Sequence, residues 1–376
     1  MKILLFANTD WYLYNFRRSL ALALKASGCE LLLLSPPGPY GEKLSALGLR
    51  WQPVDLHRRS LNPLREAGFV LSLARLLRRE RPDVVHGFTL KCAIYGSLAA
   101  RLAGVPGRVN AVTGMGYVFT SDDLKARLLR PLVRVLLRLA LDGKRARLIL
   151  QNPDDVAFFT GHRLVHPDRI RLIPGSGVDC ERFHPGPPRE PVGPLRVLLP
   201  ARLLLDKGLA EYVAAARQLQ GEGRDIQFLL AGQPDPGNPA SVPEANVKQW
   251  VDEGVLEWLG HVEDMPALFR SVDVVALPSY REGLPKGLIE AGASGCALVT
   301  TDVPGCREVV ADGIDGLIVP VKDSVALAHA IDRLLQDPAL RIQLGQASRR
   351  RVQREHEVGA VNSRTLSVYW DVMSTA

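Results

Sequence analysis

Two glutamates frame the segment REGLPKGLIE, residues 281–290, which also holds two glycines and a proline. The run DVVALPSY predicts a buried strand that ends near Tyr280, and LPKGLIEAGAS predicts a helix with Pro285 in its first turn. We therefore expect Glu282 in a strand-to-helix loop and Glu290 about one and a half turns into the helix. Carboxylates there could bind sugar and ribose hydroxyls, and the helix start suits a diphosphate. The plainer alternative is a surface glutamate and a helix-capping glutamate.

Three other segments carry residues suited to a nucleotide or its phosphates. Arg202 and Lys207 follow a predicted strand, where two cations could neutralise a diphosphate, although a solvated turn would look the same. The glycine-rich stretch 175–177 could let the backbone approach a ligand, or it could form a hinge. A turn at 261–264, around Val262, could contact a base through its main chain.

The elements that must position these residues alternate between short apolar strands and amphipathic helices along the whole chain. Such alternation predicts parallel sheets covered by helices on both faces. The proline- and glycine-rich stretch 178–194 interrupts the pattern and predicts a linker. We therefore expect an α/β protein with two tandem Rossmann-like, doubly wound domains that face an interdomain cleft. Their expected bounds are 1–177 and 195–354, followed by a closing helix at 355–376 that could pack back on the first domain.

Composition agrees with a globular chain that buries sizeable cores: 376 residues, 47% hydrophobic and 23% charged. The five cysteines are scattered and form no CxxC pair, which fits a reducing compartment rather than a disulfide framework. The N-terminal MKILLFANTD predicts a first buried strand rather than a signal peptide, and no apolar run is long enough for a membrane span.

Charge is divided unevenly between the two halves of the chain. Residues 1–180 hold 27 Lys and Arg against 14 Asp and Glu, a balance of +13, and the remainder balances at −6. Within the segment 124–148, Arg127, Arg130, Arg134 and Arg138 fall on one face of a predicted helix, with leucine and valine on the others. Such a helix could lie on an anionic bilayer surface. The alternatives are a buried helix with one exposed arginine stripe and a generally arginine-rich composition.

In this order, the elements resemble family 4 of the retaining glycosyltransferases, which have the GT-B fold. The most specific part is the E-x7-E element from Glu282 to Glu290. The resemblance implies a nucleotide-sugar donor in the second domain and an acceptor in the first. It implies that Glu282 contacts the transferred sugar, that Glu290 holds the ribose, and that Arg202 and Lys207 bind the diphosphate. The candidate catalytic residues are thus Glu282, Arg202 and Lys207, and the candidate donor-binding residues are Gly283, Leu284, Pro285, Lys286, Glu290, Val262, Gly175, Ser176 and Gly177.

The first domain resembles bacterial enzymes that extend undecaprenyl-diphosphate-linked sugars for O-antigen, capsule or glycoprotein glycans. The resemblance rests on WYLYNFRRSL, FTLKCAIYGSLAARLAGVP and AVTGMGYVF. Arg17 and Lys91 match basic positions of that group and could meet the lipid diphosphate. Two stretches depart from the pattern of many family members: Asn8, Thr9 and Asp10 stand where those have a Gly-Gly loop, and Thr113 stands where they have a histidine. The candidate acceptor-binding residues are Asn8, Thr9, Arg17, His86, Lys91, Thr113 and Gly114.

The resemblance implies transfer with retained configuration, in which the leaving phosphate takes the acceptor's proton. The sequence has no D-x-D motif and no cluster of metal ligands, so we expect neither a metal nor another cofactor. We expect a UDP-linked N-acetylhexosamine as donor, a lipid-linked saccharide as acceptor, peripheral attachment to the inner face of the cytoplasmic membrane, and no nucleic acid. Alternatives are a nucleotide-sugar epimerase, which needs no acceptor, and a non-catalytic partner subunit that binds nucleotide sugar or lipid.

Overall fold

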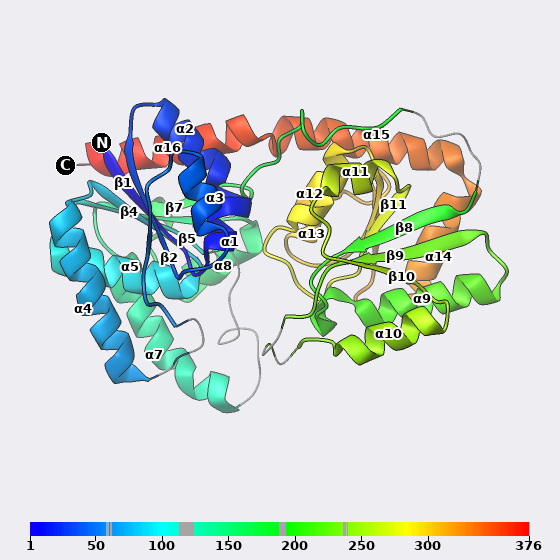
Figure 1. Cartoon of the computed structure of the whole chain (residues 1–376), viewed down its shortest axis with the longest axis horizontal. Helices are drawn as coiled ribbons and strands as arrows, with labels where there is room; N and C mark the ends of the chain where they lie inside the picture. Colours follow the sequence, from blue (N-terminus) through cyan, green and yellow to red (C-terminus); the bar gives the residue numbers. More distant parts are fainter. Residues whose placement is uncertain are drawn as a thin grey trace. The chain divides into compact units, whose positions relative to one another are not determined.

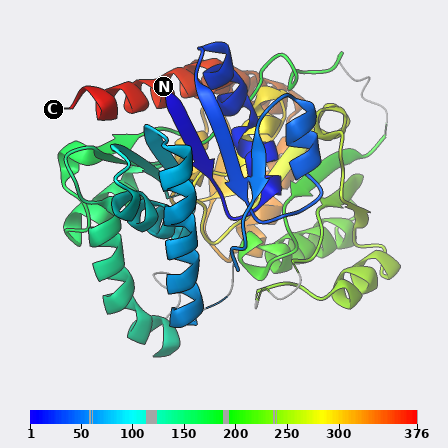
Figure 2. The same ribbon diagram turned by 60° about the vertical axis from the view of Figure 1, so that its left-hand side comes forward.

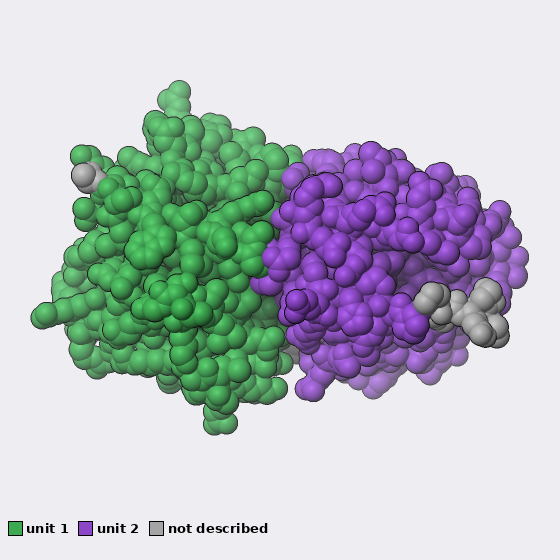
Figure 3. All heavy atoms as spheres, turned by 90° about the horizontal axis from the view of Figure 1, so that it is seen from above, with its two compact units in different colours: residues 1–176, 359–376 green, residues 177–358 purple. Residues whose placement is uncertain are grey.

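The computed structural model describes residues 1–57, 60, 62–112, 124–187, 193–235, 238 and 240–375, the side chains of 124–126 excepted. Two of the candidate acceptor residues, Thr113 and Gly114, therefore lie outside the described residues. The chain forms two compact units, one of residues 1–176 with 359–376 and one of residues 177–358 (Figure 3). Each unit is built on a parallel sheet with helices on its faces (Figure 1), as the strand–helix alternation predicts.

Unit 1 is a seven-stranded parallel sheet of order β3-β2-β1-β4-β5-β6-β7. Its strands are β1 (Lys2–Phe6), β2 (Glu30–Ser35), β3 (Trp51–Pro53), β4 (Val84–Phe88), β5 (Gly107–Ala111), β6 (Ala146–Leu150) and β7 (Ile170–Leu172). Its helices are α1 (Asp10–Tyr12), continued by a π-helical turn (Leu13–Arg17), α2 (Arg18–Ala26), α3 (Gly41–Ala46), α4 (Pro63–Glu80), α5 (Leu90–Ala103), α7 (Leu124–Leu141), α8 (Pro153–Gly161) and α16 (Val358–Ser374).

The strands β3, β6 and β7 lack a long apolar run like those of β1 and β2. β3 and β7 have only three residues each, and the second residue of β6 is Arg147. Arg147 is nevertheless buried, since its guanidinium has a carboxylate partner inside unit 1. Short strands, and strands that contain a buried, paired charge, cannot be predicted from apolar runs in the sequence.

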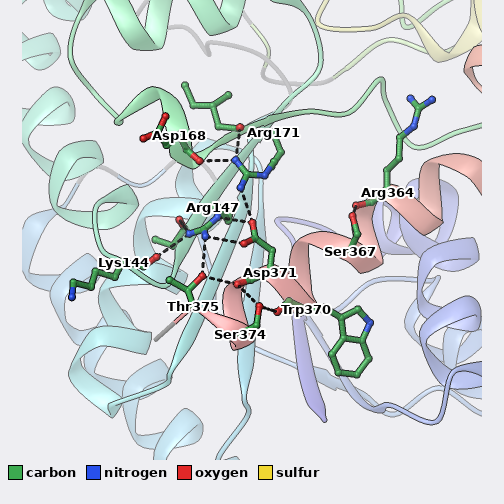
Figure 4. A network of polar contacts seen from close by, with 12 residues as sticks. Lys144, Arg147, Asp168, Arg171, Arg364, Ser367, Trp370, Asp371, Ser374 and Thr375 are labelled. Carbon is green, nitrogen blue, oxygen red and sulfur yellow. Dashed lines mark hydrogen bonds and ion pairs between the residues drawn. The ribbon is translucent and has the colours of Figure 1, made fainter.

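The last helix, α16, is held on the sheet of unit 1 by apolar packing and by one ionic network (Figure 4). Tyr369 and Val372 lie in the same buried cluster as β1 and β4. Asp371 accepts hydrogen bonds from Arg147 Nε at 2.9 Å and from Arg171 Nη2 at 2.7 Å. These bonds, that of Arg147 above all, hold the pKa of Asp371 below its ordinary value although partial burial opposes the shift. Helix α16 is therefore part of unit 1.

Helix α7 (Figure 2) exposes an apolar stripe beside two exposed arginines, Arg127 and Arg138, instead of an arginine stripe alone. Its exposed fractions are 72% at Leu128, 56% at Leu132, 51% at Val135 and 49% at Leu139, positions that share one helical face. The arginines are less free: Arg138 donates to two backbone carbonyl groups of the stretch 162–163, and Arg130 and Arg134 are half-buried. No helix within the described residues is both long and apolar enough to span a bilayer.

Unit 2 is a six-stranded parallel sheet of order β10-β9-β8-β11-β12-β13. Its strands are β8 (Leu195–Pro200), β9 (Ile226–Ala231), β10 (Glu257–Gly260), β11 (Val274–Leu277), β12 (Ala297–Thr301) and β13 (Leu317–Val319). Its helices are α9 (Leu209–Gly221), α10 (Glu244–Asp252), α11 (Met265–Arg270), α12 (Lys286–Ala293), α13 (Cys306–Val309), α14 (Ser324–Gln336) and α15 (Pro338–Glu355). The chain runs outward from β8 on one side and from β11 on the other, so the strand order reverses between these two strands.

The first part of the expected linker is packed into unit 2. Val178 and Phe183 are buried in its core, and the Val178 amide donates to the His356 carbonyl at 2.9 Å. Residues 188–192 lie outside the described part of the chain. Residues 178–187 are therefore part of unit 2, because two apolar side chains among the prolines and glycines suffice to anchor this stretch.

Candidate active site

The strand-order reversal in unit 2 brings together the loops that follow β8 and β11, where doubly wound sheets bind their ligands. Lys207 closes a short 3₁₀ turn after β8, and Glu282 lies in the loop before α12. Strand β11 ends at Leu277, three residues earlier than the sequence predicts. The residues from Pro278 to Pro285 therefore all belong to the loop.

Lys207 and Glu282 form an ion pair within this loop region. Lys207 Nζ lies 2.6 Å from Glu282 Oε1, and the two side chains are only 17% and 11% exposed. Ser279, which is fully buried, donates its hydroxyl hydrogen bond to the same Oε1 at 2.7 Å. Two donors on one carboxylate oxygen fix the orientation of Glu282 and neutralise much of its charge. Among the described residues, no side chain or amide hydrogen-bonds to Oε2, so this oxygen is left for a ligand.

Sequence reasoning missed Ser279. The one available signal was the S-x-x-E spacing of residues 279–282, which usually marks a helix capping box. Here both residues lie in a loop and bond side chain to side chain, because the strand ends earlier than its apolar run suggests.

The loop that carries Glu282 is held from the side of β12. Thr300 Oγ1 donates to the Leu277 carbonyl at 2.9 Å, and Thr301 Oγ1 donates to that of Ser279. Gly305, with φ of 81°, lies against the loop backbone, where an added Cβ would come within 2.6 Å of the Gly283 carbonyl oxygen. Only glycine fits such an approach at this backbone angle. Glu282 is therefore positioned before any ligand arrives.

The two loops are also tied to each other. The Tyr280 amide donates to the Asp206 carbonyl at 2.9 Å, beside the turn that carries Lys207. Gly208, with φ of 73°, packs on the Pro278 carbonyl, from which an added Cβ would be only 2.1 Å away. The phenol of Tyr280 donates to Glu211, and burial, followed by that carboxylate, raises its pKa to about 12. The two backbone segments that carry Lys207 and Glu282 are thus held against each other.

The other candidate donor residues form separate pairs. Arg202 is exposed and pairs with Asp235 at 2.8 Å, and no contact joins it to Glu282 within the described residues. Lys286 opens α12 and lies 3.3 Å from Glu290, one turn along the same helix. Pro285 is buried and precedes the helix rather than forming its first turn. The ligand roles of these residues stay predictions.

The remaining candidate donor residues are spread over both units. Val262 follows β10 and packs, half-buried, on the core of unit 2. Gly175 and Ser176 close the first segment of unit 1, and Gly177 opens unit 2. Gly177 packs so closely on Val358 that an added Cβ would be 2.6 Å from its Cα, which gives this glycine a packing role. Leu284, in the loop before α12, is half-buried against the same core as Val262.

In unit 1, the candidate acceptor residues Asn8 and Thr9 follow β1, and Thr9 caps α1 by accepting from the Tyr12 amide at 3.1 Å. Arg17 ends the π-helical turn and is 5% exposed. Its guanidinium lies 4.4 Å from the centre of the Phe88 ring. Turns of π-helix are rare and frequently occur at functional sites.

The other two described acceptor candidates are engaged inside unit 1. His86 is completely buried, and its Nδ1 lies 2.6 Å from the Tyr369 hydroxyl. Burial, reinforced by the charge of Arg17, holds the pKa of His86 well below its ordinary value, so the ring is neutral. Lys91 contacts the carbonyl groups of His57 and Ser60, and also the Glu66 carboxylate at 3.0 Å, so it holds the stretch before α4.

Neither a reactive thiol nor a cluster of metal ligands accompanies the ion pair within the described residues. Burial, followed by the charge of Glu282, raises the pKa of Cys306 to about 12, so this thiol stays protonated at neutral pH. No group of three or more His, Cys, Asp or Glu side chains that could hold a metal ion occurs within the described residues. The groups at this site that could bind or polarise a substrate are therefore a positioned carboxylate and the lysine cation beside it, close to the start of a helix.

Comparison with known families matches the two parts of the chain to two glycosyltransferase models. The model described as glycosyl transferase 4-like matches residues 2–152, and that described as glycosyl transferases group 1 matches residues 194–337. Together the two matches span most of the chain.

Curated relatives include an N,N'-diacetylbacillosaminyl-diphospho-undecaprenol α-1,3-N-acetylgalactosaminyltransferase from Campylobacter jejuni, which is 28% identical over 92% of both chains. A UDP-Gal:α-D-GlcNAc-diphosphoundecaprenol α-1,3-galactosyltransferase from Escherichia coli is 28% identical over 76% of this chain and 74% of that protein. Among solved structures, sucrose-phosphate synthase from Thermosynechococcus elongatus has a TM-score of 0.81 at 20% identity, with full coverage of both chains. Anabaena HepE in complex with UDP has a TM-score of 0.78 at 18% identity and covers 98% of this chain and 99% of its own. The protein is therefore a glycosyltransferase with the GT-B fold, and it belongs to the group 1 glycosyltransferases of the family 4 type.

Proposed function

We propose that the protein transfers an N-acetylhexosamine from a UDP-sugar to a saccharide linked through diphosphate to undecaprenol, in the synthesis of a cell-surface glycan. The observation that carries the proposal is the Lys207–Glu282 pair at the strand-order reversal of unit 2. The two curated relatives above support the acceptor class, since both are named for acceptors of this kind. The complex of HepE with UDP supports the nucleotide.

In the proposed reaction, Lys207 binds the donor diphosphate and offsets the negative charge that develops as UDP leaves. A phosphate that approaches Lys207 competes with Glu282 Oε1 for the ammonium group, whereas Ser279 continues to hold the carboxylate. Glu282 then orients the transferred sugar through its second oxygen. Arg202 adds a cation at the rim and Glu290 takes the ribose hydroxyls. Gly283, Leu284 and Lys286 present backbone amides to the donor.

We further propose that the configuration of the sugar is retained and that no metal takes part. The leaving phosphate accepts the proton of the acceptor hydroxyl on the same face of the sugar. A covalent route through Glu282 is less favoured, because both its neighbours donate to one oxygen and reduce its nucleophilicity. The lysine cation supplies the charge that a metal ion supplies in other transferases.

The test is a radiolabel transfer assay in EDTA with UDP- and GDP-linked sugars against undecaprenyl-diphosphate-linked mono- and disaccharides. We expect label to enter the lipid phase from one UDP-N-acetylhexosamine, with the α configuration of the donor kept in the product. Glu282→Ala should abolish transfer, and Glu263→Ala, at an exposed position after β10, should leave it intact.

Three outcomes would contradict the proposal. Conversion of a donor in the absence of acceptor would indicate the epimerase, and tight donor binding without turnover would indicate the non-catalytic subunit. Transfer that requires added Mg²⁺ or Mn²⁺ would remove the metal-independent mechanism while leaving the transferase itself in place.

The proposed lipid acceptor requires access to a membrane, and α7 offers the surface for it. Four exposed apolar side chains lie on one face of this helix, and its sequence contains five basic residues and no acidic residue. Exposed apolar groups beside cations fit the interface of an anionic bilayer, where each cation adds about 1 kcal/mol of attraction. We propose peripheral attachment through α7 on the inner face of the cytoplasmic membrane.

Vesicle sedimentation tests the attachment. The protein should bind vesicles that contain phosphatidylglycerol, release from them in high salt, and bind phosphatidylcholine vesicles weakly. Leu132→Glu should weaken binding by roughly tenfold, since it places a negative charge where an apolar side chain would enter the bilayer. Ile342→Glu, at an equally exposed position in α15 of unit 2, is the matched control and should bind as the wild type does. Equal loss in both variants would refute α7 as the contact.

A further inference from the structure

Three buried polar atoms around Phe88 in unit 1 lack a hydrogen-bond partner within the described residues. They are Arg17 Nε, His86 Nε2 and Thr89 Oγ1. The rings of His86 and Phe88 are 4.0 Å apart, the Arg17 guanidinium lies 4.4 Å from the Phe88 ring centre, and Thr89 follows Phe88 in the chain. Buried polar groups in native proteins are almost always paired, so a cluster of unpaired ones points to a missing partner.

Thr89 is held in a backbone conformation that threonine rarely adopts. Its φ is +71° and its ψ is 158°, a region that is essentially restricted to glycine and is least accessible to β-branched residues. Its amide donates to the Ala111 carbonyl and its carbonyl accepts from the Ala93 amide, so both sides of the residue are fixed. The fold thus keeps a threonine where glycine would be less strained, which indicates that the side chain itself is needed.

The side chain of Thr89 is not used to cap the helix that it precedes. A threonine at this position normally accepts a hydrogen bond from an amide of the first helical turn. Helix α5 has no such side-chain cap, although it runs for 14 residues and carries a full helix dipole. The hydroxyl is therefore left to a group outside the described residues, and the amino end of α5 keeps the preference of a helix start for negative charge.

Arg17 supplies the charge that identifies this group as an anion. It is 5% exposed, its one side-chain hydrogen bond goes to the neutral Tyr12 hydroxyl at 3.0 Å, and no carboxylate pairs with it among the described residues. A buried cation without a counter-ion is strongly disfavoured unless a ligand provides the charge. Its neighbour His86 is neutral and cannot do so.

We propose that Thr89 Oγ1, the amino end of α5 and Arg17 together bind a phosphate group of the lipid-linked acceptor. The inference rests on the proposed function for the identity of the ligand, and it assigns Thr89 as a binding residue. The hydroxyl donates to a phosphate oxygen, the helix end offers amides to the same anion, and the guanidinium neutralises it.

The experiment compares Thr89→Val, Thr89→Ser and Thr89→Gly in the full-length protein. Valine keeps the shape but removes the hydroxyl, so the KM for the lipid acceptor should rise about tenfold or more while the KM for the donor stays unchanged. Serine keeps the hydroxyl and should restore an acceptor KM within about twofold of the wild type. Glycine should raise the melting temperature, because it relieves the backbone, and should raise the acceptor KM as valine does. An acceptor KM unaffected by valine and glycine would overturn the assignment.

A second experiment does not depend on sugar transfer. In the Arg202→Ala/Lys207→Ala background, which removes both cations that the proposed function gives to the donor diphosphate in unit 2, inorganic pyrophosphate should still raise the melting temperature, and Thr89→Val should abolish that rise. If pyrophosphate has no effect on this double variant, unit 1 holds no phosphate site and the inference fails. If wild-type protein transfers no sugar but the Thr89-dependent pyrophosphate effect is present, the proposed function fails while the anion site stands.

Discussion

Charged groups are treated in opposite ways at the two candidate sites of this protein. In unit 2, Lys207 and Glu282 neutralise each other and Ser279 completes the pair. In unit 1, Arg17 is more deeply buried than either, yet it has a single neutral hydrogen-bond partner among the described residues. The first site has its charges paired without a ligand, and in the proposed function it would exchange this internal ion pair for an external one. The second has no internal counter-ion among the described residues, so a bound anion would add charge pairing instead of replacing it.

This difference sets what each site contributes. A site with its own ion pair is rigid before binding, which favours the precise orientation that catalysis needs. A site with an uncompensated cation gains more free energy from binding an anion, which favours affinity. Substitutions that remove a side chain from the site in unit 2 should therefore affect turnover most. Such substitutions at the site in unit 1 should affect acceptor binding and stability.

The largest effect is expected for the ion pair itself. Lys207→Ala and Glu282→Gln should each lower kcat by about 10²- to 10³-fold, the usual range for loss of one electrostatic contact in a transition state. Because the two side chains touch, the double variant should lose far less than the product of the single losses. Steady-state kinetics of the four proteins measures this coupling. Strictly multiplicative losses would show that the two residues act independently, and would contradict the view that the site in unit 2 works as one ion pair.

The next effect concerns the backbone that holds Glu282. Gly305→Ala should destabilise unit 2 by roughly 2–3 kcal/mol, because the new Cβ meets the loop carbonyls at a positive φ. Urea unfolding measures the change. Gly68→Ala, inside α4 with open space around it, is the control and should be stabilising by up to about 1 kcal/mol. Equal stability of the Gly305 variant would mean that the loop can move aside.

Acid should weaken unit 1 through His86. Its folded pKa lies well below the ordinary value of 6.5, so the unfolded chain binds the additional proton. The stability contributed by neutral His86 is therefore fully present above pH 6.5 and is lost as the pH falls towards the folded pKa, by at most about 1.4 kcal/mol per pH unit. Hydrogen exchange of the β4 amides between pH 7 and 5 reports it. His86→Gln should flatten this pH dependence, and an unchanged slope would assign it to another group.

The smallest effect is expected for Ser279→Ala. Loss of one hydrogen bond to a carboxylate that keeps its lysine should lower kcat by about tenfold. The KM for the donor should change little, since Lys207 still binds the diphosphate. Ser279→Thr offers a hydroxyl again and should recover part of the rate if the crowded site accepts its methyl group. A rate unaffected by alanine would show that Lys207 alone positions Glu282.

A large part of this protein can be predicted from its sequence. The alternation of apolar strands with helices predicts two parallel α/β sheets, and the structure confirms them. The E-x7-E element predicts the glycosyltransferase family, which the family matches confirm. Both features are local in the chain, since the pattern that marks a strand or a motif lies within about ten residues and does not depend on a distant segment.

Other features depend on where distant segments meet. Ser279 contacts Glu282 because β11 ends early, and Gly305 matters because the chain returns from β12 onto the loop. Arg17 looks like any surface arginine in the sequence, but packing on Phe88 buries it with no counter-ion in the part of the chain that the structure describes. The arginines of α7 suggest a basic face, whereas packing of unit 1 half-buries Arg130 and Arg134 and leaves three leucines of the helix exposed.

Most of the elements, the fold class and the family therefore follow from the sequence alone, because hydrophobic period and motif spacing are properties of neighbouring residues. Only the tertiary structure decided which of the many charges are paired, which are buried alone, and which backbone positions are strained. Those properties arise when segments tens to hundreds of residues apart come within hydrogen-bond distance, as Lys207 and Glu282 or His86 and Tyr369 do. Burial then makes each unpaired group energetically significant.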